Sequence, residues 1–93
     1  MMPSKTSWAL RISRQAEEDL DWFRRHDRKL YLKCFDLTRA VLMDPHNGIG
    51  KPEPLKYLGG DVWSRRVSLE HRMVYEIFGN LIVVAAFRYH YEP

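Results

Sequence analysis

Alternating apolar and polar residues predict strands near the start of the chain and throughout its last third. Residues 8–13, Trp-Ala-Leu-Arg-Ile-Ser, alternate in this way and predict one short strand. Runs rich in β-branched and aromatic residues predict three more strands, at residues 62–68, 72–78 and 81–89. Gly79-Asn80 is a turn signal between the last two runs, and the short connections predict an antiparallel arrangement of these three strands.

Between the first strand and the others, apolar residues recur at helical spacing in two adjacent segments. Ser13 is a candidate cap for the first helix, one face of which carries Ala16, Leu20 and Phe23. Asp27 is a candidate cap for the second helix, with an apolar stripe formed by Leu30, Cys34, Leu37 and Val41. Asp44-Pro45 ends this helix, because a residue before proline is disfavoured in the helical region. Two helices joined by so short a turn predict an αα-hairpin.

Residues 46–60 follow neither pattern. They contain four glycines and two prolines, which predicts a loop, and long loops in compact domains tend to carry function. A chain of 93 residues has room for a single domain, residues 1–93. The element order is β-α-α-β-β-β. We therefore expect an α+β fold, with the helical hairpin packed on one face of a mostly antiparallel sheet.

Side chains of a strand alternate between the two faces of a sheet, so residue numbers sort the last three strands into faces. Apart from Arg65, the odd positions predict an apolar face against the helices: Trp63, Val67, Leu69, Met73, Tyr75, Ile77, Leu81, Val83, Ala85 and Phe87. The even positions predict a mainly cationic face away from the helices: Ser64, Arg66, Ser68, Arg72, Glu76, Arg88 and His90, with Val74, Val84 and Ala86 between them.

This sorting sets a geometric condition on any site that combines Arg72 with His90. If the turn at Gly79-Asn80 has two residues, position 72 faces position 87, and Arg72 and His90 lie on opposite faces. They share a face only if the loop has an odd length or a bulge shifts the register.

Composition and charge narrow the classes of protein. The chain is 45% hydrophobic and 29% charged, which is typical of a globular protein and excludes a disordered tail or a fibre. The chain has no apolar run near the ~20 residues of a membrane span, so we expect no association with a membrane. It shows no export signal, and it has one cysteine. We therefore expect a cytoplasmic protein. Ten of the fifteen basic residues are Arg, whose planar fork binds phosphate. With a net charge of +3, the Arg-rich face favours a nucleic-acid partner over a merely solvated surface.

The most unusual local sequence is Lys-Pro-Glu-Pro-Leu-Lys at residues 51–56. Its two prolines hold the carboxylate of Glu53 on a stiff, extended backbone. Taken alone, Glu53 also fits a solvated linker. Together with Arg72 and His90, it completes a set of groups that can cleave RNA through the RNA's own 2′-hydroxyl. That reaction needs a base for the hydroxyl proton, a cation for the phosphorane and an acid for the leaving 5′-oxygen, without metal or cofactor.

Other motifs carry less weight. Gly48-Ile49-Gly50-Lys51 is not a P-loop, because Pro52 follows the lysine where Ser or Thr is required. The four histidines show no metal-ligand spacing. Cys34 lies on the apolar stripe of the second helix, which predicts a small core residue. Trp22 lies beside the stripe of the first helix and fits either a protein interface or the edge of the core.

Four blocks of sequence occur in order: Gly50–Lys56, Trp63–Arg66, Glu70–Tyr75 and Arg88–Tyr91. Together they resemble the YoeB/Txe family of toxins from bacterial toxin–antitoxin modules, within the RelE/ParE superfamily. The resemblance runs roughly from Trp8 to Tyr91. It implies the fold expected above and the activity of a messenger-RNA endonuclease that acts on the ribosome.

The resemblance also implies roles and partners. Glu53 would be the general base, Arg72 the transition-state stabiliser and His90 the general acid. Three further residues would hold the substrate or support the site: Lys56, Arg66 and Tyr91. The partners implied are a cognate antitoxin of the YefM/Phd kind, the ribosome with its messenger RNA, and a second copy of the chain in a homodimer. Two alternatives stay open: a non-enzymatic toxin of the superfamily that binds a protein such as DNA gyrase, and a nucleic-acid-binding module without chemistry.

Overall fold

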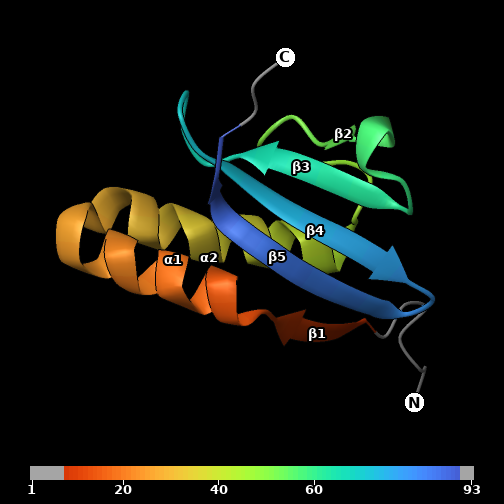
Figure 1. Ribbon diagram of the computed structural model, residues 1–93, viewed down its shortest axis with the longest axis horizontal. Coiled ribbons are helices and arrows are strands. Elements are labelled where there is room, and N and C mark those ends of the chain that lie inside the picture. Colours follow the sequence, from red (N-terminus) through yellow and green to blue (C-terminus); the bar gives the residue numbers. More distant parts are fainter. Residues whose placement is uncertain (1–7, 91–93) are drawn as a thin grey trace.

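The computed structural model describes residues 8–90, which form one sheet with two helices packed on one of its faces (Figure 1). The first elements are strand β1 (Ala9–Ile12), helix α1 (Arg14–His26) and helix α2 (Arg28–Met43). The others are β2 (Glu53–Pro54), the 3₁₀ helix η1 (Lys56–Leu58), β3 (Val62–Arg66), β4 (Arg72–Phe78) and β5 (Leu81–Tyr89). The α+β class and the order of the main elements are confirmed. Across this described part of the chain, no helix has the length and apolar character needed to cross a membrane.

The sheet has five strands in the order β1-β5-β4-β3-β2. Strands β2 to β5 are paired antiparallel, as predicted for β3, β4 and β5. Strand β1 lies at the other edge and runs parallel to β5, with Ala9 opposite Leu81 and Ile12 opposite Val84. The sheet is therefore mixed, with one parallel pair at one edge.

Both helices begin at the caps that the sequence predicts. Ser13 Oγ accepts a hydrogen bond from the Ala16 N–H (3.0 Å), and Asp27 Oδ1 accepts one from the Leu30 N–H (3.1 Å). The Ser13 hydroxyl also donates to the Ala85 carbonyl (2.8 Å). One side chain thus caps α1 and ties its start to β5.

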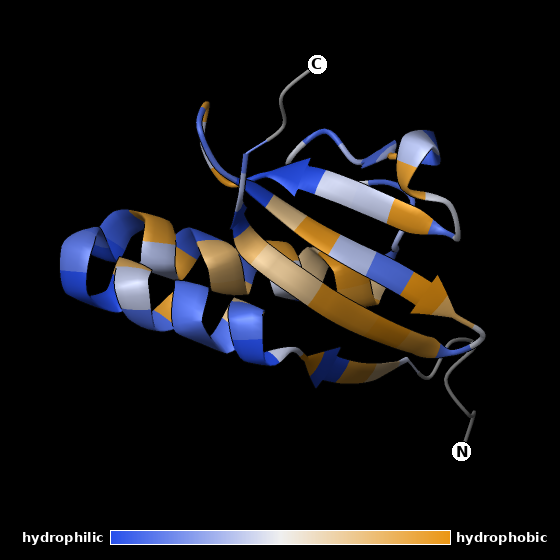
Figure 2. Ribbon diagram, in the orientation of Figure 1, coloured by the Kyte–Doolittle hydropathy of each residue, from blue (hydrophilic) through white to orange (hydrophobic). Residues whose placement is uncertain are grey.

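The apolar faces of the helices and of the sheet meet in one core. Most of β5 is hydrophobic, whereas much of α1 is hydrophilic on its outer side (Figure 2). The predicted helical stripes are confirmed, since Ala16, Phe23, Cys34, Leu37 and Val41 are buried and Leu20 and Leu30 pack against them. The sheet contributes Val67, Met73, Tyr75, Ile82, Val84 and Phe87.

The sorting of the sheet faces by odd and even numbers is wrong for the first half of β5. The turn at Gly79-Asn80 has two residues, so Phe78 pairs with Leu81 and Tyr75 with Val84. The core face therefore passes from odd numbers on β4 to even numbers on β5. Buried Ile82 and Val84 take the places predicted for Leu81, Val83 and Ala85.

Leu69 was also expected in the core and is 96% exposed. The reason is that β3 ends at Arg66, two residues earlier than the predicted strand 62–68. The backbone then turns, with the N–H groups of Val67 and Ser68 both donating to the His71 carbonyl. Leu69 lies in this turn and points away from the sheet.

Arg65 interrupts the apolar face of β3, and its contacts show why an arginine fits there. Its side chain is fully buried. Its guanidinium donates to the carbonyls of Asp44 (2.5 Å), Asn47 (3.0 Å) and Ile49 (3.1 Å). Its Nε donates to the Tyr75 hydroxyl (3.2 Å). Because buried carbonyls need hydrogen-bond donors, Arg65 organises the segment that follows α2.

Two glycines let that segment approach Arg65 closely. Gly48 and Gly50 adopt φ angles of 130° and 84°, a region that favours glycine. A Cβ atom at Gly48 would lie 2.9 Å from Arg65 Nη1, and one at Gly50 would lie 2.8 Å from Leu37 Cδ2. The Gly50 carbonyl also accepts the Arg66 N–H (2.6 Å), which brings the segment onto the sheet just before Glu53.

The predicted loop 46–60 contains two short elements that sequence patterns did not indicate, β2 and η1. Glu53 pairs with Ser64 and Pro54 with Trp63, so β2 forms an edge of the sheet. An edge strand tolerates proline because only one of its sides is paired. This pairing fixes the backbone of Glu53 beside β3.

We expect Arg65→Met to lower the free energy of unfolding by about 3 kcal/mol or more. The substitution leaves several buried acceptors unpaired, at about 1–3 kcal/mol each. Arg66→Met is the matched control, because the neighbouring arginine is exposed and its loss should cost less than about 0.5 kcal/mol. Urea unfolding followed by circular dichroism measures both, and equal small losses would contradict the role assigned to Arg65.

Candidate active site

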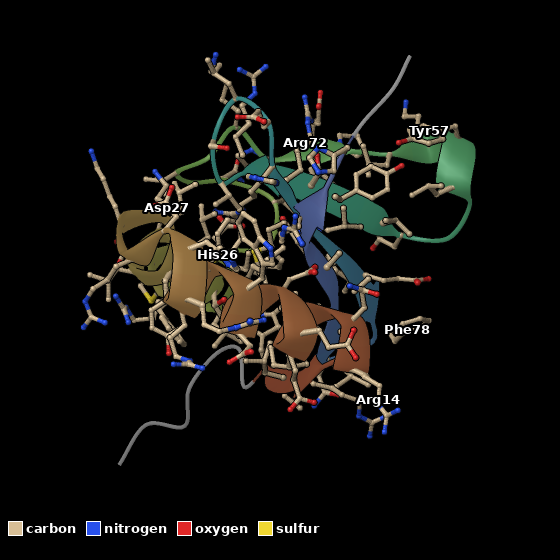
Figure 3. All side chains as sticks on the ribbon, turned by 60° about the vertical axis from the view of Figure 1, so that its left-hand side comes forward. Arg14, His26, Asp27, Tyr57, Arg72 and Phe78 are labelled. Atoms are coloured by element: carbon tan, nitrogen blue, oxygen red, sulfur yellow. The ribbon has the colours of Figure 1, made fainter. Side chains whose placement is uncertain are left out.

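Two side chains of opposite charge are in contact at the edge of the sheet that β2 forms. Arg72 is the first residue of β4, and its Nη1 donates to Glu53 Oε1 and to Ser64 Oγ (3.1 Å). The Arg72 side chain is 18% exposed and that of Glu53 is 53% exposed. The pair is therefore open to solvent on the Glu53 side, with Arg72 near the top of the view in Figure 3.

Sheet register places more of the predicted residues beside this pair. Arg66 on β3 is opposite Arg72, and Arg72 is opposite Tyr89 on β5. Residues directly opposite one another project from the same face of a sheet. Arg66, Arg72 and Tyr89 therefore form a row across the face that carries Glu53.

Helix η1 lies at one end of this row. The Tyr57 hydroxyl is 3.0 Å from the Tyr89 hydroxyl, which joins η1 to β5 across the sheet. Lys56 precedes Tyr57 in η1 and is exposed. Of the predicted site residues, Glu53, Arg66 and Arg72 thus lie together, and Lys56 stands beside the tyrosine pair.

His90 lies elsewhere. It follows the last residue of β5, and its ring contacts that of His71, with centroids 4.9 Å apart. The His71 ring meets the core residue Phe23 edge-on at 5.1 Å. The His90 ring therefore lies on the helix side of the sheet, and no shared face with Arg72 is formed.

The register explains why the condition for a shared face is not met. The turn has two residues, and two register shifts follow it between β4 and β5. Together they move the partner of Arg72 from position 87 to Tyr89. A shift of two positions again pairs Arg72 with an odd-numbered residue, so Tyr89 projects from the same face as Arg72. The next residue, His90, then faces the helices.

A buried carboxylate binds the backbone of β5 at one of these register shifts. Asp19 of α1 is 3% exposed, and its Oδ2 accepts the N–H groups of both Phe87 (2.9 Å) and Arg88 (3.1 Å). Two consecutive N–H groups aimed at one side of a strand are a feature of a bulge rather than of a regular ladder. Asp19 therefore stabilises the register that places Tyr89 on the face of Arg72.

Arg88 is a second departure from the predicted cationic face. Its Cζ lies 3.8 Å from the centroid of the Trp22 ring, a cation–π contact with α1. The face away from the helices keeps Arg66 and Arg72, but not Arg88 or His90. Trp22 itself packs against the core, which agrees with the interpretation of this residue as a core edge. Tyr91, another predicted site residue, lies outside the described residues.

Burial perturbs two titratable side chains near the core. Burial lowers the pKa of the His71 imidazole below its usual value of 6.5, and electrostatic interaction with His90 and Arg88 lowers it further. Burial also raises the pKa of the Cys34 thiol to about 12. The prediction that Cys34 is a core residue is confirmed by its complete burial.

The paired side chains have clear chemical capacities. The half-exposed carboxylate of Glu53 can accept a proton from a bound hydroxyl, and the Arg72 guanidinium can donate to phosphate oxygens. Within residues 8–90, no three His, Cys, Asp or Glu side chains are placed to hold a metal ion together.

Sequence reasoning missed three residues of this region: Tyr57, Tyr89 and Asp19. Asp19 left a signal, because it lies three residues after Ala16 and four before Phe23, on the buried face of α1. A carboxylate at such a position indicates a buried partner. The two tyrosines left none, since their contact depends on a 3₁₀ helix and a register that no pattern specified.

Comparison with known proteins identifies relatives along most of the chain. Residues 12–91 match the model of the YoeB-like toxins of bacterial type II toxin–antitoxin systems. Toxin YoeB of Synechocystis sp. is 43% identical over 74 residues, which cover 80% of this chain and 86% of the relative. Toxin YoeB of Escherichia coli K12 is 37% identical over 79 residues, which cover 85% of this chain and 94% of the relative.

Solved structures show the same fold. The YoeB dimer from Staphylococcus aureus superposes with a TM-score of 0.80 at 40% identity, covering 90% of this chain and 98% of that one. YoeB in the heterotetrameric YoeB–YefM toxin–antitoxin complex from the same organism gives a TM-score of 0.77 at 39% identity. That match covers 92% of this chain and all (100%) of the other.

We expect the free energy of unfolding to fall as the pH drops below about 6.5. The pKa of His71 is lowered in the folded protein, so the unfolded chain binds a proton there more readily. Well above that pH the His71 ring is neutral in both the folded and the unfolded chain, so its contribution to the free energy of unfolding no longer changes with pH. His71→Phe keeps a ring against Phe23 and should flatten the profile between about pH 5 and 7. His26→Phe, at an exposed position, is the control, and urea titrations at several pH values would show whether only His71→Phe removes the slope.

Proposed function

We propose that this chain, which belongs to the family of YoeB-like toxins of bacterial type II toxin–antitoxin systems, is a ribosome-dependent messenger-RNA endoribonuclease. The observation that carries the proposal is the contact between Glu53 and Arg72 on an open face of the sheet. A base and a phosphate-binding cation at hydrogen-bond distance are the two groups that transesterification of RNA needs at the attacked phosphate.

The proposed reaction uses the 2′-hydroxyl of the substrate as the nucleophile. Glu53 takes the proton of that hydroxyl while the 2′-oxygen bonds to the adjacent phosphorus. Arg72 turns its donors from Glu53 to the phosphate oxygens and stabilises the charge that develops there. The bond from phosphorus to the 5′-oxygen breaks, and a proton from His90 neutralises the leaving oxygen. The products are a 2′,3′-cyclic phosphate and a free 5′-hydroxyl, and no metal takes part.

The role of His90 requires a movement. Its ring contacts His71 on the helix side, whereas the phosphate would lie against Arg72 on the other side. His90 comes after Tyr89, the last residue paired in β5, and is exposed. We propose that a rotation of the backbone beyond Tyr89, which leaves the paired residues of the sheet in place, turns the imidazole toward Arg72. In this proposal the His71 contact is a resting position.

The remaining predicted residues hold the substrate. Arg66 lies opposite Arg72 and extends the cationic row along a phosphodiester backbone. Lys56 is exposed in η1 and supplies a further positive charge. Tyr91 follows His90 directly and is proposed to contact the substrate as well. A target on the ribosome would place the protein in the cytoplasm.

The partners proposed for this chain follow from the S. aureus relatives. One of these is a YoeB dimer, and the other is YoeB in complex with YefM. We propose a cognate antitoxin of the YefM kind for this chain and self-association as a dimer. An acidic segment of the antitoxin would cover Arg66 and Arg72, which also blocks access to Glu53.

We expect cleavage of messenger RNA on ribosomes to fall by roughly 10²–10⁴-fold in Glu53→Gln, Arg72→Met and His90→Gln, the usual scale for acid–base and electrostatic groups. Glu18→Gln, at an exposed position on α1, is the matched control and should cleave like wild type. Messenger with a 2′-deoxy group at the cut nucleotide should resist cleavage, because the nucleophile is missing. A chelator that removes zinc and other transition metals but leaves the Mg²⁺ that ribosomes need should have no effect. Primer extension and product-end analysis measure these outcomes.

Three results would contradict this mechanism. A 3′-hydroxyl at the cut end, or loss of activity with a chelator that spares the Mg²⁺ of the ribosome, would indicate a metal-activated water instead. Wild-type protein that binds ribosomes without cutting would support a toxin or nucleic-acid-binding module that acts by binding alone.

Antitoxin binding provides a separate test. We expect Arg66→Glu to weaken the complex and to reduce its salt dependence, since it replaces a cation at the centre of the proposed interface. Lys29→Glu makes the same charge change at an exposed position on α2 and should have little effect. Calorimetry at about 0.05 and 0.5 M salt compares the variants, and a salt-independent affinity that Arg66→Glu leaves unchanged would place the antitoxin elsewhere.

A further inference from the structure

We propose that Tyr57 is a stacking platform for the base of the nucleotide at which the substrate is cut. This inference deepens the proposed function and rests on it. The geometry that points to it is an exposed phenol ring joined through Tyr89 to the row that contains Arg72.

Tyr57 lies at the site without being part of the core. Its side chain is 56% exposed, on the short helix that begins three residues after Glu53. Its hydroxyl is 3.0 Å from that of Tyr89, and Tyr89 is paired with Arg72 across the sheet. In Figure 3 Tyr57 and Arg72 lie on the same side of the sheet, away from the helix that carries His26.

The ring stands on a backbone that is fixed to the sheet. Leu55 is 4% exposed and donates its N–H to the Val62 carbonyl (2.8 Å). Leu58 donates to the Leu55 carbonyl (3.1 Å) and Gly59 to that of Lys56 (3.2 Å), which closes the turn of η1. Gly59 has a φ of 72°, a conformation in which glycine costs nothing, and this ends the helix. Tyr57 is thus presented at a defined distance from Glu53.

An exposed ring in this position suits a nucleobase. Every base has a π face that can stack on an aromatic side chain. Removing such a side chain lowers the affinity for the nucleic acid by about 5- to 150-fold. The contact between the Tyr57 and Tyr89 hydroxyls lies at the surface and contributes little to folding, because water competes for both groups. It shows that the Tyr57 ring reaches over the face that carries Glu53 and Arg72, while the backbone of η1 holds the ring there.

Stacking would act on the reaction through position. Holding the base fixes the attached ribose, and the 2′-hydroxyl must come within hydrogen-bond reach of Glu53 for its proton to be taken. Lys56, next to Tyr57, can hold a neighbouring phosphate by charge. A platform and a cation on one turn of helix would bind one nucleotide by its base and by its backbone.

The test compares substitutions that keep or remove the ring. With programmed ribosomes, Tyr57→Ala should lower kcat/KM for cleavage by about 5- to 150-fold. Tyr57→Phe and Tyr57→Trp should stay within about threefold of wild type, because both keep a π surface. Phe78→Ala is the matched control: Phe78 is 52% exposed at the opposite end of β4 (Figure 3), and its loss should not affect cleavage.

A photochemical measurement reports the contact itself. Messenger carrying 2′-deoxy-5-iodouridine at the cut position stays intact, and irradiation should crosslink it to Tyr57 of wild-type protein, as read by mass spectrometry of the peptides. A crosslink confined to Tyr89 or Tyr91, or Tyr57→Ala that cleaves like wild type, would overturn the inference while the proposed nuclease stands. Wild-type protein that does not cleave at all would overturn the proposed function and this inference together.

Discussion

The position of the candidate site depends on one buried cation whose partners, among residues 8–90, are neutral oxygens. Arg65 lies in the core face of β3 and donates to the carbonyls of Asp44, Asn47 and Ile49 and to the hydroxyl of Tyr75. A charge is costly to bury, and only a guanidinium offers enough donors in a fixed plane to satisfy so many acceptors at once. The segment after α2 is therefore wrapped around Arg65. Since it leads directly into β2, Arg65 determines where the backbone delivers Glu53.

A second constraint acts at the other end of the chain, where Asp19 binds the N–H groups of Phe87 and Arg88. Because side chains alternate along a strand, the register fixed at this bulge decides which of two neighbours meets Arg72. It selects Tyr89 and directs His90 to His71. A residue of α1 thus influences which side chain joins the candidate site, through two hydrogen bonds to the backbone of β5.

The sequence specified the elements far better than their register. The caps at Ser13 and Asp27, both helical stripes and the strands 72–78 and 81–89 followed from local rules of spacing and composition. The core positions of β5 did not, since a two-residue turn and two register shifts change the parity by amounts that no local pattern reveals. The short strand at Glu53–Pro54 was hidden for a related reason: the prolines before and after Glu53 indicate a loop, and only pairing with β3 makes this segment a strand. The sequence nevertheless singled out Glu53 and Arg72 for their chemistry, and the structure brings these two side chains into contact. Arg88 was misplaced, because its stacking on Trp22 is a tertiary contact.

The ion pair of Glu53 and Arg72 contributes little to folding, which makes its place in the structure informative. Glu53 is 53% exposed, and pairs so open to water are worth about 0–1 kcal/mol. Such a contact can be exchanged at small cost, unlike the buried bonds of Arg65. A phosphate that approaches the sheet competes with Glu53 for the Arg72 guanidinium and offers it more oxygen atoms. Once displaced, the carboxylate has a free lone pair beside the bound substrate. In the proposed reaction, the pair would therefore keep both groups in position while the site is empty, and substrate binding would separate them into the base and the cation that the reaction requires.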